Sequence, residues 1–396
     1  MTNVGVPLQE LDDQTLTPVV ARALNTATIT LGQWQATKIH ENYNPLTEGV
    51  YRVTGTAHAG ARTLPWSVIL KIVRWWDMSA NFSSDWANDP THFFYWKREA
   101  LVFQSGILHG LQHQLAPPTC YGVLDVAGDR LWLWLEDVQE TQPGRWNLDR
   151  HILAARHFGQ FNGAFAQAAA LPTYPWLSQH FLRQWLAFCR AWQSDAILGD
   201  ASVWSDSAVH GVLPSNLVPR ILALLRDADV LLAALEALPQ TLCHLDTDRR
   251  NLFSRSDHDG QAQTVVIDWG FLGLAAVGED LGNQVGGELF HLAVRPSEAT
   301  KYADAALTAY LDGLREMQWH GQIEDVGLAM RLHQLHYLGI SPLIVQDFVR
   351  EGFIQPWMRA WMSEHDATPA EAFRQWGDAL MFLVTQAEAA HHDVVG

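Results

Sequence analysis

The segment 243–270 constrains the fold of this chain more than any other stretch. It opens with CHLDTDRRN, in which His244, Asp246 and Asn251 follow the spacing His-x-Asp-x-x-x-x-Asn. An apolar run further on ends in Asp268, followed by Trp and Gly. Turn-forming residues separate two short extended runs between these pieces, which predicts a hairpin. We therefore expect a loop and a returning strand to bring three oxygen-bearing side chains to one point.

Carboxylate and amide oxygens in this arrangement suit phosphoryl transfer. Mg²⁺ prefers oxygen ligands and keeps several waters, so Asp268 and Asn251 are candidate metal ligands beside a nucleotide. The transfer itself needs mainly positioning and neutralisation of charge on the transferred group. Asp246 is then left to orient an acceptor hydroxyl and take its proton. The structural alternative makes Asp246 a turn former or helix cap, and Asp268 the centre of an Asx-turn.

This pair of motifs resembles the catalytic and metal-binding loops of the aminoglycoside phosphotransferase and choline kinase families. One position departs from their pattern, because Leu245 stands where the family mostly has Gly. The resemblance implies a two-lobed α+β enzyme of protein-kinase-like fold, with ATP and Mg²⁺ between the lobes. The N-terminal lobe would be an antiparallel sheet with one main helix, and the larger C-terminal lobe would be mostly helical.

The resemblance also implies two supporting residues. His244 would pack and form hydrogen bonds that hold the catalytic loop, without transferring a proton. Asp280 lies a dozen residues beyond Asp268, where the family has an Asp that supports the loop from behind. A helix N-cap is the alternative interpretation of Asp280. Arg250 could meet phosphate or substrate, although a solvent-exposed arginine explains it as well.

A lone lysine, Lys71, interrupts the apolar run 66–73, which predicts a strand. Burial of an unpaired ammonium is costly, so Lys71 either reaches water from an edge strand or pairs with a carboxylate. Asp followed by Pro at 89–90 is typical of a helix start and predicts a helix over 91–108, with Glu99 in its middle. By the resemblance, Lys71 held by Glu99 would contact the α- and β-phosphates of ATP.

Two further stretches bear on nucleotide binding. The break at 41–49 between predicted strands has only one glycine, and it fits either a phosphate-covering loop or an ordinary hairpin turn. The strand 131–135 ends at Glu136 and, in the family, leads to a hinge that binds adenine, so Glu136 is a further nucleotide-binding candidate. The cluster TQPG at 141–144 suits a linker, so we place the domain boundary near residue 140. Residues 1–140 would bind the nucleotide, and residues 141–396 would hold the catalytic loop and the acceptor pocket.

Composition limits the partners. The formal net charge is −17 and there is no basic stripe, which argues against nucleic acid. An acidic protein attracts a cationic small molecule, but the charge equally suits ordinary solubility. No apolar run approaches membrane-spanning length, and the N-terminus does not have the pattern of a signal peptide. Three scattered cysteines form no disulfide framework, which favours a cytoplasmic location. Nothing indicates the oligomeric state.

The remainder of the chain predicts helices at 148–170, 179–198, 214–238, 298–319, 323–346 and 369–390. In the family such helices build the acceptor pocket. Tryptophans are frequent there, and each either lines a pocket for a ring or a quaternary amine, or belongs to the core: Trp176, Trp185, Trp204, Trp319, Trp357 and Trp361. A site for a polycationic amino sugar would instead need carboxylates, for which Glu279, Glu288 and Asp347 are available.

The resulting hypothesis is an ATP-dependent phosphotransferase that acts on a hydroxyl of a small molecule, of the amino sugar, amino alcohol or natural-product class. The alternative is a catalytically weak, kinase-like module that binds a nucleotide or another ligand. The intact acidic residues favour the enzyme, whereas the glycine-poor stretch at 41–49 leaves the alternative open.

Overall fold

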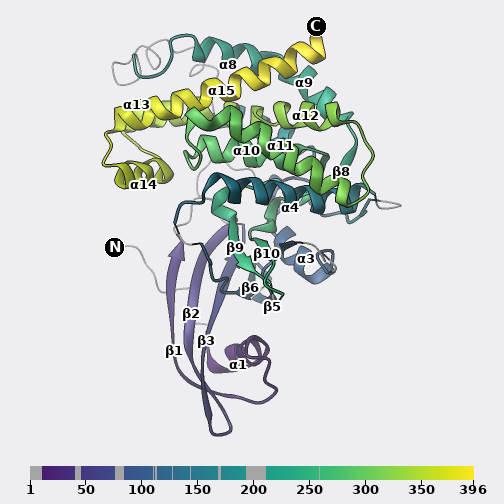
Figure 1. Ribbon diagram of the computed structural model, residues 1–396. Helices are drawn as coiled ribbons and strands as arrows, with labels where there is room; N and C mark the ends of the chain where they lie inside the picture. Colours follow the sequence, from purple (N-terminus) through teal and green to yellow (C-terminus); the bar gives the residue numbers. More distant parts are fainter. Residues whose placement is uncertain are drawn as a thin grey trace. The chain divides into compact units, whose positions relative to one another are not determined.

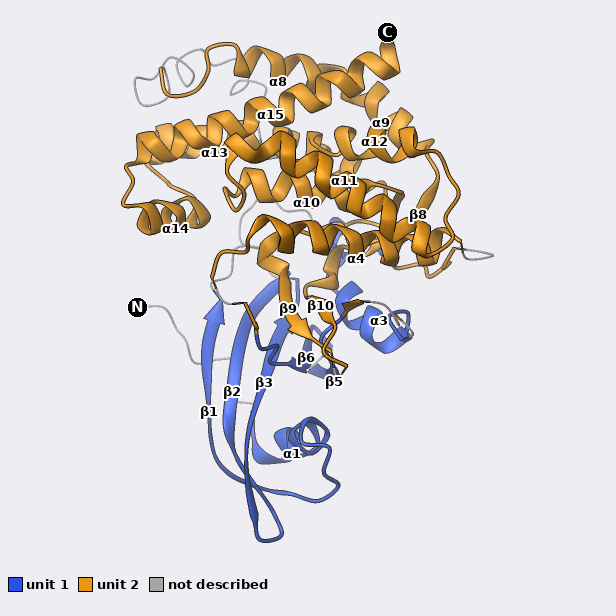
Figure 2. Ribbon diagram, in the orientation of Figure 1, with its two compact units in different colours: residues 1–90, 94–110, 117–139 blue, residues 91–93, 111–116, 140–396 orange. Residues whose placement is uncertain are grey.

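The structure is a computed structural model, and it describes residues 11–40, 46–75, 84–109, 111, 114–126, 128–142, 144–167, 171–192, 211–257 and 259–396. The chain forms two compact units, coloured separately in Figure 2. Unit 1 comprises residues 1–90, 94–110 and 117–139, and unit 2 comprises residues 91–93, 111–116 and 140–396. The first part of the predicted break at 41–49, up to residue 45, and Trp204 lie outside the described residues.

Unit 1 is built on a five-stranded antiparallel sheet with the strand order β1-β2-β3-β6-β5 (Figure 1). Its strands are β1 (Thr30–His40), β2 (Thr47–Ala59), β3 (Arg62–Val73), β5 (Cys120–Val126) and β6 (Arg130–Glu136). Helix α1 (Asp13–Ala23) begins at the cap Asp12, whose side chain accepts from Thr15 N at 2.8 Å. Leu16 and Val20 of α1 pack into the same apolar core as Val53 and Val68 of the sheet.

The helix that carries Glu99 is shorter than predicted. Helix α3 covers only Arg98–Ser105, and Asp89 lies after the separate short helix α2 (Ser84–Asn88) rather than capping a longer one. The aromatic run between them, in which Phe93, Phe94 and Trp96 are all buried, forms turns instead of a continuous helix.

Unit 2 contains two small sheets beside its helices. One has the order β4-β10-β9, with β4 (Leu115–Ala116), β9 (Leu252–Ser256) and β10 (Ala262–Val266). Strands β9 and β10 form the predicted hairpin, with Leu252 opposite Val266. The other sheet has the order β7-β11-β8, with β7 (Ser178–Gln179), β8 (Gln240–Cys243) and β11 (Gly273–Ala276). The strands that precede and follow the motif at 244–251, β8 and β9, therefore belong to different sheets.

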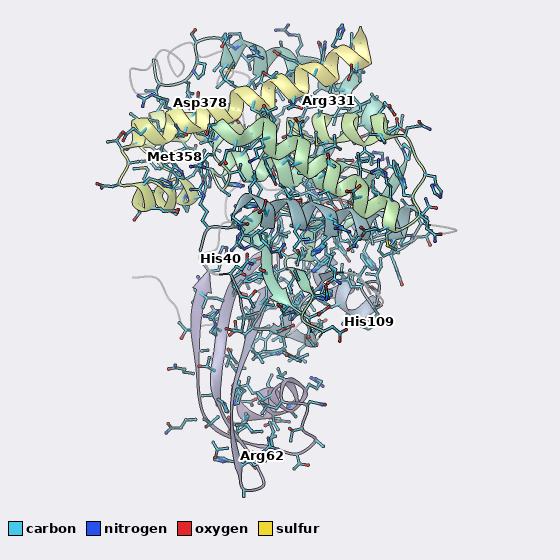
Figure 3. All side chains as sticks on the ribbon, viewed as in Figure 1. His40, Arg62, His109, Arg331, Met358 and Asp378 are labelled. Atoms are coloured by element: carbon cyan, nitrogen blue, oxygen red, sulfur yellow. The ribbon has the colours of Figure 1, made fainter. Side chains whose placement is uncertain are left out.

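Helices make up most of unit 2: α4 (Leu148–Ala166), α5 (Phe181–Trp192), α8 (Leu217–Arg226), α9 (Ala228–Glu236), α10 (Glu279–Phe290), α11 (Ala299–Glu316), α12 (Ile323–Leu332), α13 (Leu335–Glu351), α14 (Pro356–His365) and α15 (Pro369–Val395). Arg331, labelled in Figure 3, donates to Asp393 at 2.6 Å and joins α12 to α15. Two predicted helices are each split in two, at Asp227 and at His333–Gln334. None of the described helices is both long and apolar enough to span a membrane.

Two helices of unit 2 set the frame of the catalytic loop. All twelve residues of α10 are buried, including five polar ones, so this helix runs through the interior of the unit. Helix α4 packs closely against α11, because a Cβ at Gly159 would lie 2.1 Å from Tyr310 O and one at Gly313 would lie 2.1 Å from Arg156 O. This α+β architecture, an antiparallel N-terminal sheet and a larger, mostly helical part, confirms the predicted fold class.

Candidate active site

The predicted catalytic loop leaves β8 at Cys243 and enters β9 through the 3-10 turn η1 (Arg249–Asn251). The amide Nδ2 of Asn251 donates to the backbone O of Asp246 at 3.0 Å. The backbone O of Asn251 accepts from Ile267 N at 3.0 Å, and Asp268 is the next residue. Two hydrogen bonds therefore tie together the segments that carry Asp246, Asn251 and Asp268.

The three candidate site residues are more exposed to solvent than the two residues predicted to support the loop. Asp246, Asn251 and Asp268 are each partly accessible, whereas His244 and Asp280 are fully buried. A residue that meets substrate or metal must be reachable, and a residue that only orients others can be buried. The exposure therefore follows the division of roles that the sequence predicts.

Both ring nitrogens of His244 form hydrogen bonds that hold the loop. Its Nδ1 accepts from Asp246 N at 3.2 Å, which places the proton on Nε2, and Nε2 lies 3.0 Å from Ile267 O. The ring also packs edge-on against Trp269 at 4.6 Å. With both nitrogens engaged, His244 connects the catalytic loop to the strand before Asp268 and has no free position for proton transfer.

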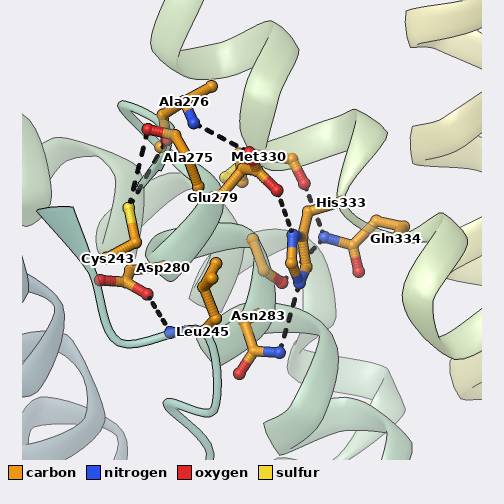
Figure 4. Close-up of polar contacts among 12 residues, drawn as sticks. Cys243, Leu245, Ala275, Ala276, Glu279, Asp280, Asn283, Met330, His333 and Gln334 are labelled. Carbon is orange, nitrogen blue, oxygen red and sulfur yellow. Dashed lines mark hydrogen bonds and ion pairs between the residues drawn. The ribbon is translucent and has the colours of Figure 1, made fainter. Parts of the chain in front are cut away.

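Asp280, at the N-terminus of α10, anchors the same loop. One carboxylate oxygen accepts from His244 N at 3.0 Å. The other accepts from Leu245 N at 2.8 Å, as Figure 4 shows. Asn162 of α4 donates to this carboxylate at 2.9 Å. Burial raises the pKa of Asp280, although the hydrogen bonds from Asn162, Leu245 and His244 each lower it. The predicted position of Asp280 behind the loop agrees with these contacts.

Both loops of the site contain a non-glycine residue with a left-handed backbone. Leu245 has φ of +69° and Asp268 has φ of +61°. Such conformations cost on the order of 1–3 kcal/mol and persist where the surroundings impose them. At Leu245 two features impose this backbone conformation. The N–H of Leu245 donates a hydrogen bond to Asp280, and its side chain is completely buried. This explains why the family mostly has Gly here and how this chain accommodates Leu.

A second anchor was missed by the sequence analysis. Asn283, one turn after Asp280 on α10, accepts from Thr247 N at 2.6 Å. Its Nδ2 lies 3.3 Å from His333 Nε2, and His333 Nδ1 lies 3.1 Å from a carboxylate oxygen of Glu279 (Figure 4). The spacing of three residues from Asp280 places Asn283 on the same helix face, and that spacing was the available signal.

The electrostatics of the loop suit a general base. Burial and the negative charges of Asp248 and Asp268 raise the pKa of Asp246 to about 7, while Arg250 and the hydrogen bond from Asn251 act in the opposite direction. A base is most effective when its pKa lies near the working pH. The sequence analysis did not single out Asp248, which is a further buried carboxylate in this loop.

Unit 1 holds the predicted lysine pair. Lys71 Nζ lies 2.6 Å from Glu99 Oε2, and both side chains are largely buried. Lys71 is opposite Val50 on β2 and Leu133 on β6, so it is in a central strand and not at an edge. The pairing with a carboxylate, rather than exposure to water, therefore explains this lysine.

Glu136, the other nucleotide-binding candidate, has a different set of contacts. One of its carboxylate oxygens accepts from Thr119 N at 3.0 Å and from Thr119 Oγ1 at 3.1 Å. Its backbone N donates to Thr119 O at 2.8 Å. The side chain thus fastens the start of β5 to the end of β6.

The described candidate tryptophans of the acceptor pocket are either buried or partly buried. Trp176 and Trp319 are buried, whereas Trp185 is partly buried and stacks on His336 at 4.4 Å. Trp357 lies 5.5 Å from His291, and Trp361 stacks on His365 at 4.4 Å.

Two of the three carboxylates considered for a polycationic acceptor are placed unfavourably for that role. Glu279 and Glu288 are buried within unit 2. Glu279 is engaged by His333 and by Ala276 N, and His151 Nδ1 lies 3.3 Å from Glu288. Asp347 is only half-buried, and burial raises the pKa of its carboxyl group. Glu279 and Glu288 therefore serve the interior of the helical unit rather than an acceptor.

Comparison with solved structures gives weak overall similarity over long stretches. An amicoumacin kinase in complex with AMP-PNP, Ca²⁺ and amicoumacin is 15% identical, covers 93% of each chain, and has a TM-score of 0.47. A spectinomycin phosphotransferase in complex with ADP and spectinomycin is 14% identical, with 97% of this chain and 99% of that chain covered and a TM-score of 0.48. A choline/ethanolamine kinase family protein from Mesorhizobium loti is 13% identical, with 89% and 92% covered and a TM-score of 0.41.

Comparison of sequences is more decisive. A search among curated proteins finds no match. The model of the phosphotransferase enzyme family matches residues 55–320, which is more than half of the chain and includes every candidate site residue from Lys71 to Asp280. This chain therefore belongs to the phosphotransferase enzyme family.

Proposed function

We propose that this protein transfers the γ-phosphate of ATP to a hydroxyl group of a small molecule, with Mg²⁺ as the metal ion. The observation that carries the proposal is the hydrogen-bonded joining of the segments of Asp246, Asn251 and Asp268, all partly accessible, above the buried supports His244 and Asp280. Residues 1–140 would bind the nucleotide, and residues 141–396 would provide the catalytic loop and the acceptor pocket.

The residues fit a magnesium ion. Asn251 Nδ2 donates a hydrogen bond to the backbone O of Asp246. Asn251 Oδ1 is the atom that can ligate a cation, and it receives no hydrogen bond from the described residues. With the carboxylate of Asp268 this makes two oxygen donors, a set that Mg²⁺ accepts when waters and phosphates complete its octahedron. Bound there, the ion would neutralise charge on the β- and γ-phosphates.

The protein's own groups would perform the remaining steps. Asp246 would accept the proton of the acceptor hydroxyl as the oxygen attacks the γ-phosphorus. His244 and Asp280 would hold the backbone of Asp246 and Leu245 in place during this step. Lys71, oriented by Glu99, would bind the α- and β-phosphates, and Glu136 would fix the strand end next to the adenine.

We propose an acceptor of the amino alcohol, amino sugar or natural-product class. The net charge of −17 supports a neutral or cationic molecule over an anionic one. The interior placement of Glu279 and Glu288 reduces the number of carboxylates for a polycationic amino sugar.

Thermal-shift measurements with ATP and Mg²⁺, followed by ATP-consumption assays with a panel of amine- and hydroxyl-bearing compounds, test this function. We expect stabilisation by MgATP and acceptor-dependent release of ADP. Stabilisation without turnover against any acceptor would favour a binding module, and the absence of any nucleotide effect would contradict the kinase assignment.

The lysine pair gives a prediction about nucleotide affinity. Lys71→Met removes the ammonium, and we expect the Kd for MgATP to rise tenfold or more, because about 1.4 kcal/mol of lost binding corresponds to a factor of ten. The double variant Lys71→Met/Glu99→Gln avoids leaving a buried carboxylate unpaired. Lys38→Met, at an exposed position of β1, is the matched control. Equal affinity in the Lys71 and Lys38 variants, measured by titration calorimetry, would contradict the assignment.

The pKa of Asp246 gives a prediction about pH. A base must be ionised to accept a proton, so its activity is present above its pKa and is lost as pH falls through it. With a pKa of about 7, kcat/KM should fall about tenfold per pH unit below neutrality. A pH–rate profile of the free enzyme measures this limb. A limb near pH 4, where an ordinary aspartate titrates, would contradict the raised pKa of Asp246.

A further inference from the structure

Asp248 is a buried carboxylate inside the catalytic loop. Its side chain is 2% exposed and caps the turn η1 by accepting from Arg250 N at 2.9 Å. Helix α10 approaches closely at this point, since a Cβ at Gly287 would lie 2.6 Å from that of Asp248. His291 Nδ1 stands 3.6 Å from the same carboxylate. Asp248 is therefore a fixed acceptor.

One edge of the Arg250 guanidinium forms hydrogen bonds with the Asp248 carboxylate. Its Nε donates to Asp248 Oδ1 at 2.9 Å and its Nη2 to Oδ2 at 2.5 Å, which is the two-pronged geometry of a strong arginine–carboxylate pair. The side chain is nevertheless 57% exposed. The described residues offer no partner to Nη1, so the second edge of the fork remains available while the first edge is bound to Asp248.

The position of Arg250 in the loop is informative. It follows Asp246 by four residues and directly precedes Asn251 in η1. Asn251 N donates to Asp248 O, and Asn251 Nδ2 donates to Asp246 O, so the turn is closed at both ends. The positive charge of Arg250 also lowers the pKa of Asp246, as a neighbouring cation does. The guanidinium oriented by Asp248 is thus next in sequence to the proposed metal ligand Asn251 and close enough to the proposed base to lower its pKa.

We propose that Arg250, oriented by Asp248, binds the non-bridging oxygens of the phosphoryl group during its transfer; this assignment rests on the proposed phosphotransferase function. The bond between the γ-phosphorus and the bridging oxygen breaks, and its electron pair leaves with ADP. A bond forms from the acceptor oxygen to the same phosphorus, and the hydroxyl proton goes to Asp246. Arg250 takes no proton and stabilises the charge spread over the equatorial oxygens. Asp248 is a positioning residue.

The competing explanation gives Arg250 only the task of neutralising Asp248. An unpaired buried carboxylate is unfavourable, so Arg250→Ala would reduce activity for that reason alone. The two explanations separate in the double variant Asp248→Asn/Arg250→Ala. This variant has neither charge of the pair, and the introduced asparagine side chain keeps an oxygen for the cap of η1. A merely neutralising Arg250 predicts that the double variant recovers activity, whereas a phosphoryl-binding Arg250 predicts that it does not.

A transition-state analogue gives a readout that needs no knowledge of the acceptor. ADP·Mg²⁺ with aluminium fluoride imitates the transferring group, and its affinity is compared with that of ADP·Mg²⁺ alone by titration calorimetry. In the wild type we expect aluminium fluoride to tighten binding. In Arg250→Ala and in the double variant we expect this gain to fall by about 10²–10³-fold, as for loss of one preoriented donor, with the affinity for ADP·Mg²⁺ unchanged.

Further variants sharpen the test. Arg250→Lys should recover only part of the gain, because an ammonium lacks the fork, and added guanidinium ion should restore part of it in Arg250→Ala. Arg295→Ala, which removes an exposed arginine paired with Glu298, should behave as wild type. If aluminium fluoride tightens binding in Arg250→Ala or in the double variant as much as in the wild type, the role of Arg250 is overturned, and the proposed function is not affected. A wild type that binds ADP·Mg²⁺ without any gain from aluminium fluoride overturns this role and the proposed function together.

Discussion

Replacement of Asp246 by alanine is expected to lower kcat by about 10²–10⁴-fold, the usual contribution of a positioned general base. The affinity for MgATP should change little, because the proposed metal ligands Asn251 and Asp268 remain and the hydrogen bond from Asn251 to the backbone O of residue 246 is kept. Steady-state ATP consumption with a productive acceptor and calorimetric titration of MgATP measure the two quantities. The Asp246→Ala variant also removes one of several neighbouring carboxylates, so its stability should not suffer.

The control for this experiment is Asp312→Ala, which removes an exposed carboxylate paired with Arg315 on α11. It should retain full activity and nucleotide affinity. Turnover at the wild-type rate in Asp246→Ala would show that the acceptor hydroxyl is activated elsewhere. Equal losses of turnover and of nucleotide affinity would show that Asp246 is a structural residue of the loop.

The second large effect is expected from Asp280→Ala. The substitution leaves the N–H groups of His244 and Leu245 and the amide of Asn162 without their acceptor. Each unsatisfied buried donor costs about 1–3 kcal/mol, so the free energy of unfolding should fall by about 3 kcal/mol or more. The loss of the bond to Leu245 N also releases the left-handed backbone that Asp280 helps to impose.

Urea unfolding followed by circular dichroism measures this loss, and kcat measures its effect on the loop. Both should fall in Asp280→Ala, whereas Asp312→Ala should leave both unchanged. Asp280→Asn is a more conservative variant that keeps one acceptor oxygen, and we expect an intermediate loss of stability. If Asp280→Ala is as stable and as active as the wild type, the carboxylate does not hold the catalytic loop.

Much of the site could be predicted because its chemistry is local in sequence. The motif at 244–251 and the strand before Asp268 specify which residues meet, since a hairpin of this length can return only to the neighbourhood of its start. The strand lysine Lys71 and its partner Glu99 were also predictable, because a buried ammonium requires an anion. The predicted family resemblance is confirmed by the family match over residues 55–320.

Other features depend on the folded structure. Helical periodicity continues through Asp227, where two helices meet and His391 lies 2.9 Å from the Asp227 carboxylate, so the pattern predicted one helix. The aromatic run before Arg98 also fits a helical pattern, and only the folded structure shows that it forms turns. The buried partners Asn283, on α10, and His333, between α12 and α13, are far apart in the sequence, and nothing in their local sequences reveals that they meet.

The backbone strain was only partly visible. Leu245 in place of the usual Gly indicated an altered turn, but the structure shows that the turn keeps a left-handed backbone at this residue. A neighbouring carboxylate and complete burial of the leucine side chain make that possible. Sequence alone gives no measure of such compensation, because it arises from α10, which begins more than thirty residues later.

We propose that Asn251 and Asp268 hold the metal ion of the nucleotide beside Asp246. Electron paramagnetic resonance of Mn²⁺ in place of Mg²⁺ measures this binding. We expect ATP and the wild-type protein together to bind Mn²⁺ tightly, and Asp268→Asn and Asn251→Ala each to weaken this binding by tenfold or more. Equal Mn²⁺ binding in the presence of ATP by the wild type and both variants would contradict it.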